Sequence, residues 1–221
     1  MLEYCKRRNA FYKNIEETEE YDMKSYEELV ALFNKANENF LCDDLSLIES
    51  CVSERTLCGA LMLHMHDLIV SDPSFKGYYT DVEYNRNKGG RVKNIKKTIL
   101  GIDEKIVTIN CDLILHSRGC HAEQDNLIAI EMKKSSRPKS EKHTDRERLM
   151  ALTKDANEGV YPYDGHTSPQ YVCGYVLGVY YEINYNKKSI KIEFYRYGTL
   201  DSTYEISYNV DELKKQWAIK K

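Results

Sequence analysis

Two carboxylates and a lysine have the types and surroundings to do chemistry together. Asp112 interrupts the apolar segment 109–115, and Glu131 and Lys133 follow the apolar run 127–130. Alternate side chains of a strand share a face, so Glu131 and Lys133 should point the same way. Burying such charges unpaired is expensive, whereas a hard divalent cation held by both carboxylates removes that cost. The cation would polarise a phosphoryl oxygen and lower the pKa of bound water, and the lysine would orient that water or stabilise developing charge.

The acid-x-Lys spacing is a weak signal without its surroundings. It occurs four times, at positions 22/24, 103/105, 131/133 and 212/214. Only the 131/133 pair ends an apolar run and lies one short loop after another apolar strand that carries an acid. The alternative interpretation is a salt bridge among Asp112, Lys133 and Glu131 near a strand end, without a catalytic role.

Glu54 is a further candidate because of its place on an expected helix. The segment from Ser53 to about Val70 has helical periodicity, and Glu54 lies at the centre of its apolar stripe. The stripe consists of Leu57, Leu61, Met65 and Leu68. A carboxylate directed at the core requires a partner. The alternative is that Glu54 only benefits from the helix dipole in the first turn.

The other elements follow from caps, breakers and periodicity. Ser25 and Glu28 have the capping-box spacing, which predicts a helix over 25–40, and Asp72-Pro73 ends the helix that starts at Ser53. The remaining expected elements are strands 77–86, 105–116 and 126–134, a helix over 143–157, a hairpin of strands 171–184 and 189–198, a strand near 203–208 and a helix from 210. This order predicts an α/β fold with a central mixed sheet flanked by helices. Residues 1–50 are expected to form an acidic, mainly helical N-terminal extension, and 51–221 the α/β domain.

Charge is distributed unevenly along the chain. The net charge is −3, yet residues 1–54 hold 13 acidic and 6 basic side chains, a net of −7, which leaves +4 for the rest. The segment 86–97 holds six cations and no acid: Arg86, Lys88, Arg91, Lys93, Lys96 and Lys97. Such a run is either a solvated loop or, beside a catalytic site, a rim that binds nucleic-acid phosphates.

The sequence carries no signal for a membrane or for secretion. No apolar run approaches the roughly 18 residues that span a bilayer. The first residues lack the apolar core of a signal peptide. The seven cysteines contain no C-x-x-C pair, which makes zinc improbable, and their odd number indicates reduced thiols. We therefore expect a cytoplasmic protein.

Six segments follow one another between about residues 50 and 200: SERTLCGALMLHMHDLI, DVEYNR, INCDLILHSRG, NLIAIEMKKS, DRERLMALT and YVCGYVLGVYYEI. This series resembles the PD-(D/E)XK nuclease superfamily, particularly its small bacterial and phage members of restriction-endonuclease-like fold. The resemblance implies a three-layer core with a central mixed sheet. It implies that Asp112 and Glu131 are the two metal-binding acids, that Lys133 is the catalytic lysine, and that Glu54 is the acid on the first core helix. Cys111 replaces the proline that the superfamily carries before the aspartate.

The resemblance also implies a function. We expect a nuclease that requires Mg²⁺ or Mn²⁺ and hydrolyses phosphodiester bonds, with DNA as the favoured substrate. The alternative is a nuclease-fold module that binds nucleic acid or protein with weak or no cleavage, which the modest net charge favours slightly. The sequence does not separate DNA from RNA. Cutting both strands of a duplex usually needs two sites, which favours a homodimer.

Overall fold

The computed structural model describes residues 23–83, 111–121, 123–154 and 173–208, together with the backbone of 94–98 and 104–108. The helices are α2 (Tyr26–Asp43), α3 (Leu45–Glu49), α4 (Glu54–Ser71), the short 3₁₀ helix η1 (Pro73–Phe75) and α5 (Lys139–Leu152). The strands are β1 (Tyr79–Val82), β2 (Asn94–Thr98), β3 (Glu104–Thr108), β4 (Leu113–His116), β5 (Asn126–Lys134), β6 (Leu177–Asn184), β7 (Ser189–Arg196) and β8 (Thr199–Ser207).

Six of these strands form one mixed sheet in the order β1-β4-β5-β6-β7-β8. β5 and β6 pair in parallel, and the other neighbours in this sheet are antiparallel. β2 and β3 form a separate antiparallel pair. The predicted α/β class with a central mixed sheet is confirmed.

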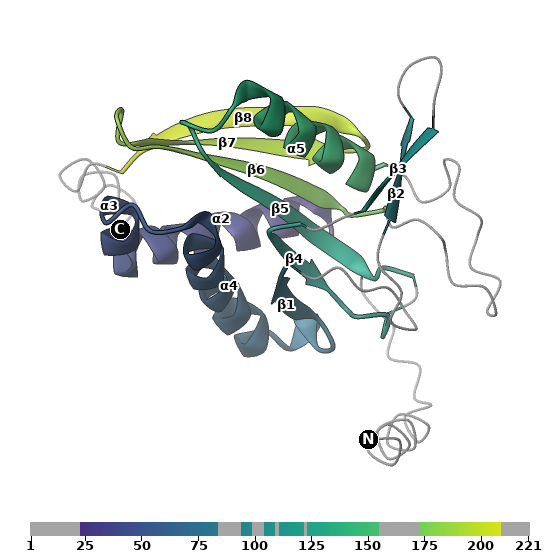
Figure 1. Cartoon of the computed structure of the whole chain (residues 1–221). Coiled ribbons are helices and arrows are strands. Elements are labelled where there is room, and N and C mark those ends of the chain that lie inside the picture. The colour runs from purple at the N-terminus through teal and green to yellow at the C-terminus, as the bar shows by residue number, and fades with distance from the viewer. Residues whose placement is uncertain are drawn as a thin grey trace, which may run out of the picture.

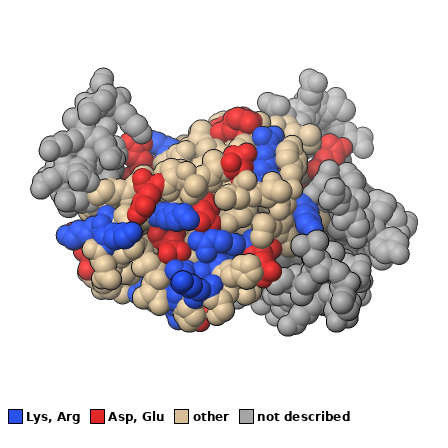
Figure 2. Space-filling view, turned by 90° about the horizontal axis from the view of Figure 1, so that it is seen from above, with Lys and Arg blue, Asp and Glu red and all other residues tan. Residues whose placement is uncertain are grey.

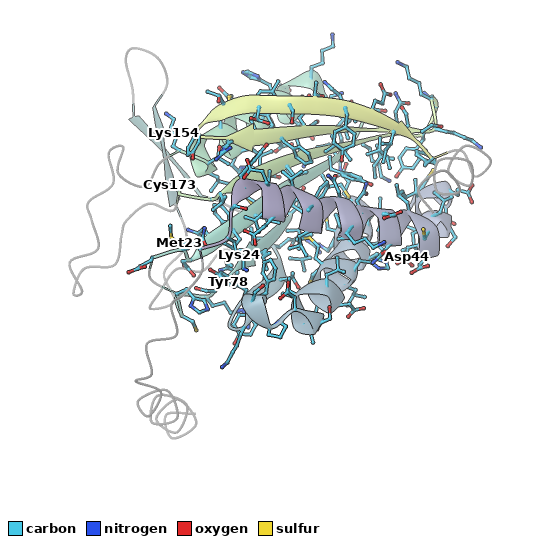
Figure 3. The ribbon with its side chains drawn as sticks, turned by 180° about the vertical axis from the view of Figure 1, so that it is seen from behind. Met23, Lys24, Asp44, Tyr78, Lys154 and Cys173 are labelled. Carbon is cyan, nitrogen blue, oxygen red and sulfur yellow. The ribbon has the colours of Figure 1, made fainter. Side chains whose placement is uncertain are left out.

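Helices cover both faces of the six-stranded sheet (Figure 1). α2 and α4 pack on one face, where the larger apolar core joins both helices to the sheet. Figure 3 shows α2 lying across this face. α5 packs on the opposite face over a smaller cluster that includes Ala129, Leu149 and Tyr180. The sheet therefore presents one mainly apolar face, under α2 and α4, and one face where charged groups are buried beneath α5.

Local signals set the beginnings of the first two long helices. The Ser25 side chain accepts a hydrogen bond from the Glu28 N–H, and the Glu28 side chain accepts one from the Ser25 N–H, so the predicted capping box is present. The Ser53 hydroxyl accepts from the Thr56 N–H and caps α4, as expected. The extended residue Asp72 ends α4 before η1, in agreement with the predicted helix stop.

The expectation of one strand over 105–116 is wrong. This stretch contains β3, which pairs with β2, and β4, which pairs with β1 and β5 in the other sheet. Both pieces have extended periodicity, so the pattern along the chain could not show that they choose different partners. Residues 109–110 between them lie outside the described part of the chain.

Other boundaries move by a few residues. α5 begins at Lys139, because Pro138 has the fixed extended backbone that suits a helix start, and it ends at Leu152. β8 begins at Thr199, four residues before the expected strand, because its first half also pairs with β7. The short α3 was not expected. The helix expected from 210 lies outside the described residues.

The described part of the expected N-terminal extension, residues 23–50, is mainly helical. α2 buries Leu29, Phe33 and Phe40 in the same core as α4 and the sheet. The Gln124 side chain also exchanges two hydrogen bonds with the Lys24 backbone, and the backbone carbonyl of Gln124 accepts one from the Tyr78 hydroxyl. The β4–β5 loop is therefore tied to the start of α2, where Figure 3 shows Lys24 near Tyr78. Of the helices described, none has the length and apolar character of a membrane span.

Candidate active site

β5 directs two of the candidate residues toward α5. Ile128, Ile130 and Met132 belong to the core beneath α2 and α4. Glu131 and Lys133 instead contact side chains of α5 on the opposite face. The alternation predicted from the sequence is confirmed, and the two charged groups project from one strand under one helix.

Asp112 lies immediately before β4 and joins this pair. Its carboxylate accepts a hydrogen bond from the Met132 N–H at 2.8 Å, which fixes it against β5. The same oxygen, Oδ2, lies 3.7 Å from Lys133 Nζ, and about a quarter of the Asp112 side chain remains exposed. The structure therefore brings Asp112 and Lys133 together at a place that solvent can reach.

Glu131 lies deeper than its two neighbours and is fully buried. Its Oε1 accepts a hydrogen bond of 2.5 Å from Arg148 Nη1. Its Oε2 is buried and has no hydrogen-bond partner among the described residues. Since buried carboxylate oxygens normally have partners, this oxygen can still accept a cation or a hydrogen bond beyond those that the described residues provide.

Two members of the site come from α5 and were not singled out in the sequence. Asp145 is buried, with Oδ2 3.3 Å from Lys133 Nζ and Oδ1 3.2 Å from Arg148 Nη1. It therefore bridges the two cations of the site. A signal existed: Asp145 precedes Leu149 and Leu152 at helical spacing, which places it on the buried stripe of α5.

The electrostatics of the cluster follow from burial and from the proximity of three acids. Burial, together with the charge of Asp112, raises the pKa of Glu131 to about 8 in spite of Arg148. Burial also raises the pKa of Asp112, against the opposing effect of Lys133. Burial would lower the pKa of Lys133, but Asp112, Asp145 and Glu131 outweigh it and raise that pKa. The lysine is therefore held as an ammonium, whereas burial disfavours the ionised form of both acids.

Glu54 lies beside this cluster but has its own partners. Its carboxylate accepts hydrogen bonds from the Lys134 N–H at 2.9 Å and from two nitrogens of Arg137 at 3.1 Å. Burial opposes ionisation, yet these bonds and the charge of Lys133 lower the pKa of Glu54. Glu54 thus stabilises the end of β5 and adds negative charge near Lys133, without a direct bond to Asp112 or Lys133 among the contacts described.

The predicted basic rim is described only in part. Arg86, Lys88, Arg91 and Lys93 lie outside the described residues. Lys96 and Lys97 belong to β2, so this end of the segment is a strand and not a loop. The backbone of β2 comes within 8 Å of that of α5, measured between Cα atoms. The end of the basic segment therefore lies beside the helix that carries Asp145 and Arg148.

The donors of the site suit a hard cation better than a soft one. Asp112 and Glu131 offer oxygen atoms only, and oxygen ligands are what Mg²⁺ and Mn²⁺ prefer. Mg²⁺ usually takes one or two carboxylates and keeps several waters. Within the described residues there is no group of three or more His, Cys, Asp or Glu side chains arranged to hold a metal ion. Among the described residues, a cation here would thus rest on the two carboxylates of Asp112 and Glu131.

Comparison of the chain with protein-family models, with curated proteins and with solved structures finds no significant match.

Proposed function

We propose that the protein is a metal-dependent nuclease that hydrolyses phosphodiester bonds, with DNA as the favoured substrate. The observation that carries the proposal is the convergence of Asp112, Glu131 and Lys133 beneath α5, with Lys133 3.7 Å from Asp112. The unpartnered buried oxygen of Glu131 supports it, because that oxygen can still accept a cation. The three-layer arrangement with a mixed sheet supports a restriction-endonuclease-like core of the PD-(D/E)XK kind.

Each residue has a role in this reaction. Asp112 and Glu131 would hold Mg²⁺ or Mn²⁺, and the bound cation would supply Lewis-acid polarisation of the phosphoryl group. Lys133 is held as an ammonium by Asp112 and Asp145 and would hydrogen-bond the attacking water or the developing phosphorane charge. Asp145 is a positioning residue, because its buried carboxylate restrains the ammonium at 3.3 Å.

One observation favours the second candidate, a nuclease-fold module that binds nucleic acid or protein with weak or no cleavage. Arg148 already neutralises Glu131 through a hydrogen bond of 2.5 Å. With all three acids ionised, Arg148 and Lys133 compensate two of the three negative charges. In that case the cluster would be a salt-bridge network that fastens α5 to the sheet.

The cleavage rates of the wild type and of the Lys133→Ala variant distinguish the nuclease from the binding module. The wild type should nick supercoiled plasmid or degrade single-stranded DNA or RNA in Mg²⁺ or Mn²⁺. Lys133→Ala should retain nucleic-acid binding and lose on the order of a hundredfold or more in cleavage rate, the usual scale for such an electrostatic group.

Lys134→Ala is the matched control. The Lys134 ammonium turns to the other side, donates to the Cys51 carbonyl and lies over the Tyr185 ring. Its removal should leave the cleavage rate unchanged. A wild type that binds these substrates without cutting them supports the binding module, and equal losses in both variants would contradict the role of Lys133.

A further inference from the structure

Arg148 makes an incomplete pair with the buried acids. A guanidinium normally meets a carboxylate with two parallel N–H donors. Here the single atom Nη1 serves both Glu131, at 2.5 Å, and Asp145, at 3.2 Å. The Arg148 Nε atom is buried and lacks a partner among the described residues, and the same is true of Glu131 Oε2.

Arg146, two residues earlier on α5, shows what a completed pair looks like in the same layer. Its Nε and Nη2 atoms donate to the two oxygens of Glu193 at 2.7 and 3.0 Å. Its guanidinium also lies 3.9 Å from the centre of the Tyr180 ring. The open pairing of Arg148 is therefore not imposed by the helix or by this face of the sheet.

The charges around Arg148 indicate what the pairing leaves room for. Asp112, Glu131 and Asp145 bring three negative charges, and Lys133 and Arg148 bring two positive ones. With all three acids ionised, one further positive charge is needed for neutrality. A divalent cation on Glu131 would supply more than that charge and would repel a guanidinium that stayed on the same carboxylate.

We infer that Arg148 is an exchangeable counter-ion of Glu131: it holds this carboxylate until a divalent cation binds, and then it moves off Glu131 and stays paired with Asp145. The inference rests on the proposed metal site. The contact between Arg148 and Asp145 then has a role, because Asp145 keeps the guanidinium paired after the cation has bound Glu131. Arg148 and the cation compete for Glu131, so Arg148 sets the affinity of the site for metal.

Calorimetric titration with Mn²⁺ alone, without nucleic acid, tests the competition. Arg148→Met removes the guanidinium and retains an apolar stem of similar length. It should bind Mn²⁺ at least about tenfold more tightly than the wild type. Arg146→Met removes an arginine from the same helix and should leave the Mn²⁺ affinity unchanged. An Arg148→Met protein that is folded and binds Mn²⁺ no more tightly than the wild type would overturn the inference.

A second measurement uses the wild-type protein, because Arg148→Met leaves Glu131 unpaired and can unfold the chain. The side-chain Nε–Hε resonance of Arg148 should shift during titration with Mg²⁺, and that of Arg146 should stay in place. Mg²⁺ binding seen by calorimetry without a change at Arg148 would refute the exchange and leave the proposed metal site intact. If neither the wild type nor Arg148→Met binds Mg²⁺ or Mn²⁺, the metal site is refuted, and the proposed function with it.

Discussion

Replacing Glu131 by glutamine should change how stability depends on pH. Burial, aided by the charge of Asp112, raises the pKa of Glu131 from 4.5 to about 8 in the folded protein. Between these values the folded chain keeps a proton that the unfolded chain releases. The stability contributed by this group is therefore complete below about pH 4.5 and is lost as the pH rises through about 8.

The size of the effect follows from the shift. One pKa unit corresponds to about 1.36 kcal/mol, so the shift of Glu131 corresponds to roughly 5 kcal/mol as a ceiling. This is a large part of the roughly 5–15 kcal/mol that stabilises a typical domain. Glu131→Gln cannot ionise and keeps an oxygen for Arg148. We compare the free energies of unfolding of this variant and the wild type by urea denaturation in EDTA. Relative to the wild type, that of the variant should rise by several kcal/mol as the pH increases from 5 to 8.5.

Glu193→Gln is the matched control, because Glu193 is a buried acid on the same side of the sheet. Burial would raise its pKa, but hydrogen bonds from Arg146, Lys191 and Tyr195 lower it to about 2. Its contribution to stability is present above about pH 4.5 and is lost toward pH 2. The difference between Glu193→Gln and the wild type should thus stay constant from pH 5 to 8.5. The free energy of unfolding of Glu131→Gln could instead run parallel to that of the wild type, or fall relative to it, as the pH rises. Arg148 would then outweigh burial in setting the pKa of Glu131, and the prediction would be wrong.

Two further predictions concern the metal and the basic segment. Mg²⁺ or Mn²⁺ should raise the melting temperature of the wild type but not that of Asp112→Asn. The asparagine still accepts from the Met132 N–H, so the metal-free variant should be at least as stable as the wild type, and a strongly destabilised variant would indicate a structural salt bridge. Alanine at Lys96 or Lys97 should weaken nucleic-acid binding and reduce its dependence on salt without changing the rate of the chemical step, and unchanged binding would exclude the phosphate-binding role of β2.

The sequence predicted those parts of the site that depend on local geometry. Strand alternation was sufficient to place Glu131 and Lys133 on one face, and the capping residues Ser25 and Ser53 fixed the starts of two helices. The break between β3 and β4 could not be read in the same way, because it depends on which strands each piece pairs with.

The residues from α5 were missed for a related reason. Asp145 and Arg148 lie in a charged stretch, and charge on a helix usually faces solvent. Their burial depends on how α5 packs on β5 and β6. This is a tertiary contact that the local sequence pattern does not reveal. The spacing of Asp145 from Leu149 was a usable sign, but Glu141, Glu147 and several lysines and arginines nearby obscured it.

A crystal structure of the protein soaked in Mn²⁺ tests the central claim most directly. The anomalous signal of manganese should show one ion in contact with the carboxylates of Asp112 and Glu131, with the Lys133 ammonium beside it. The guanidinium of Arg148 should then have left Glu131. A map with no manganese at this place, and with Arg148 still bonded to Glu131, would contradict the account and leave the cluster as a salt-bridge network.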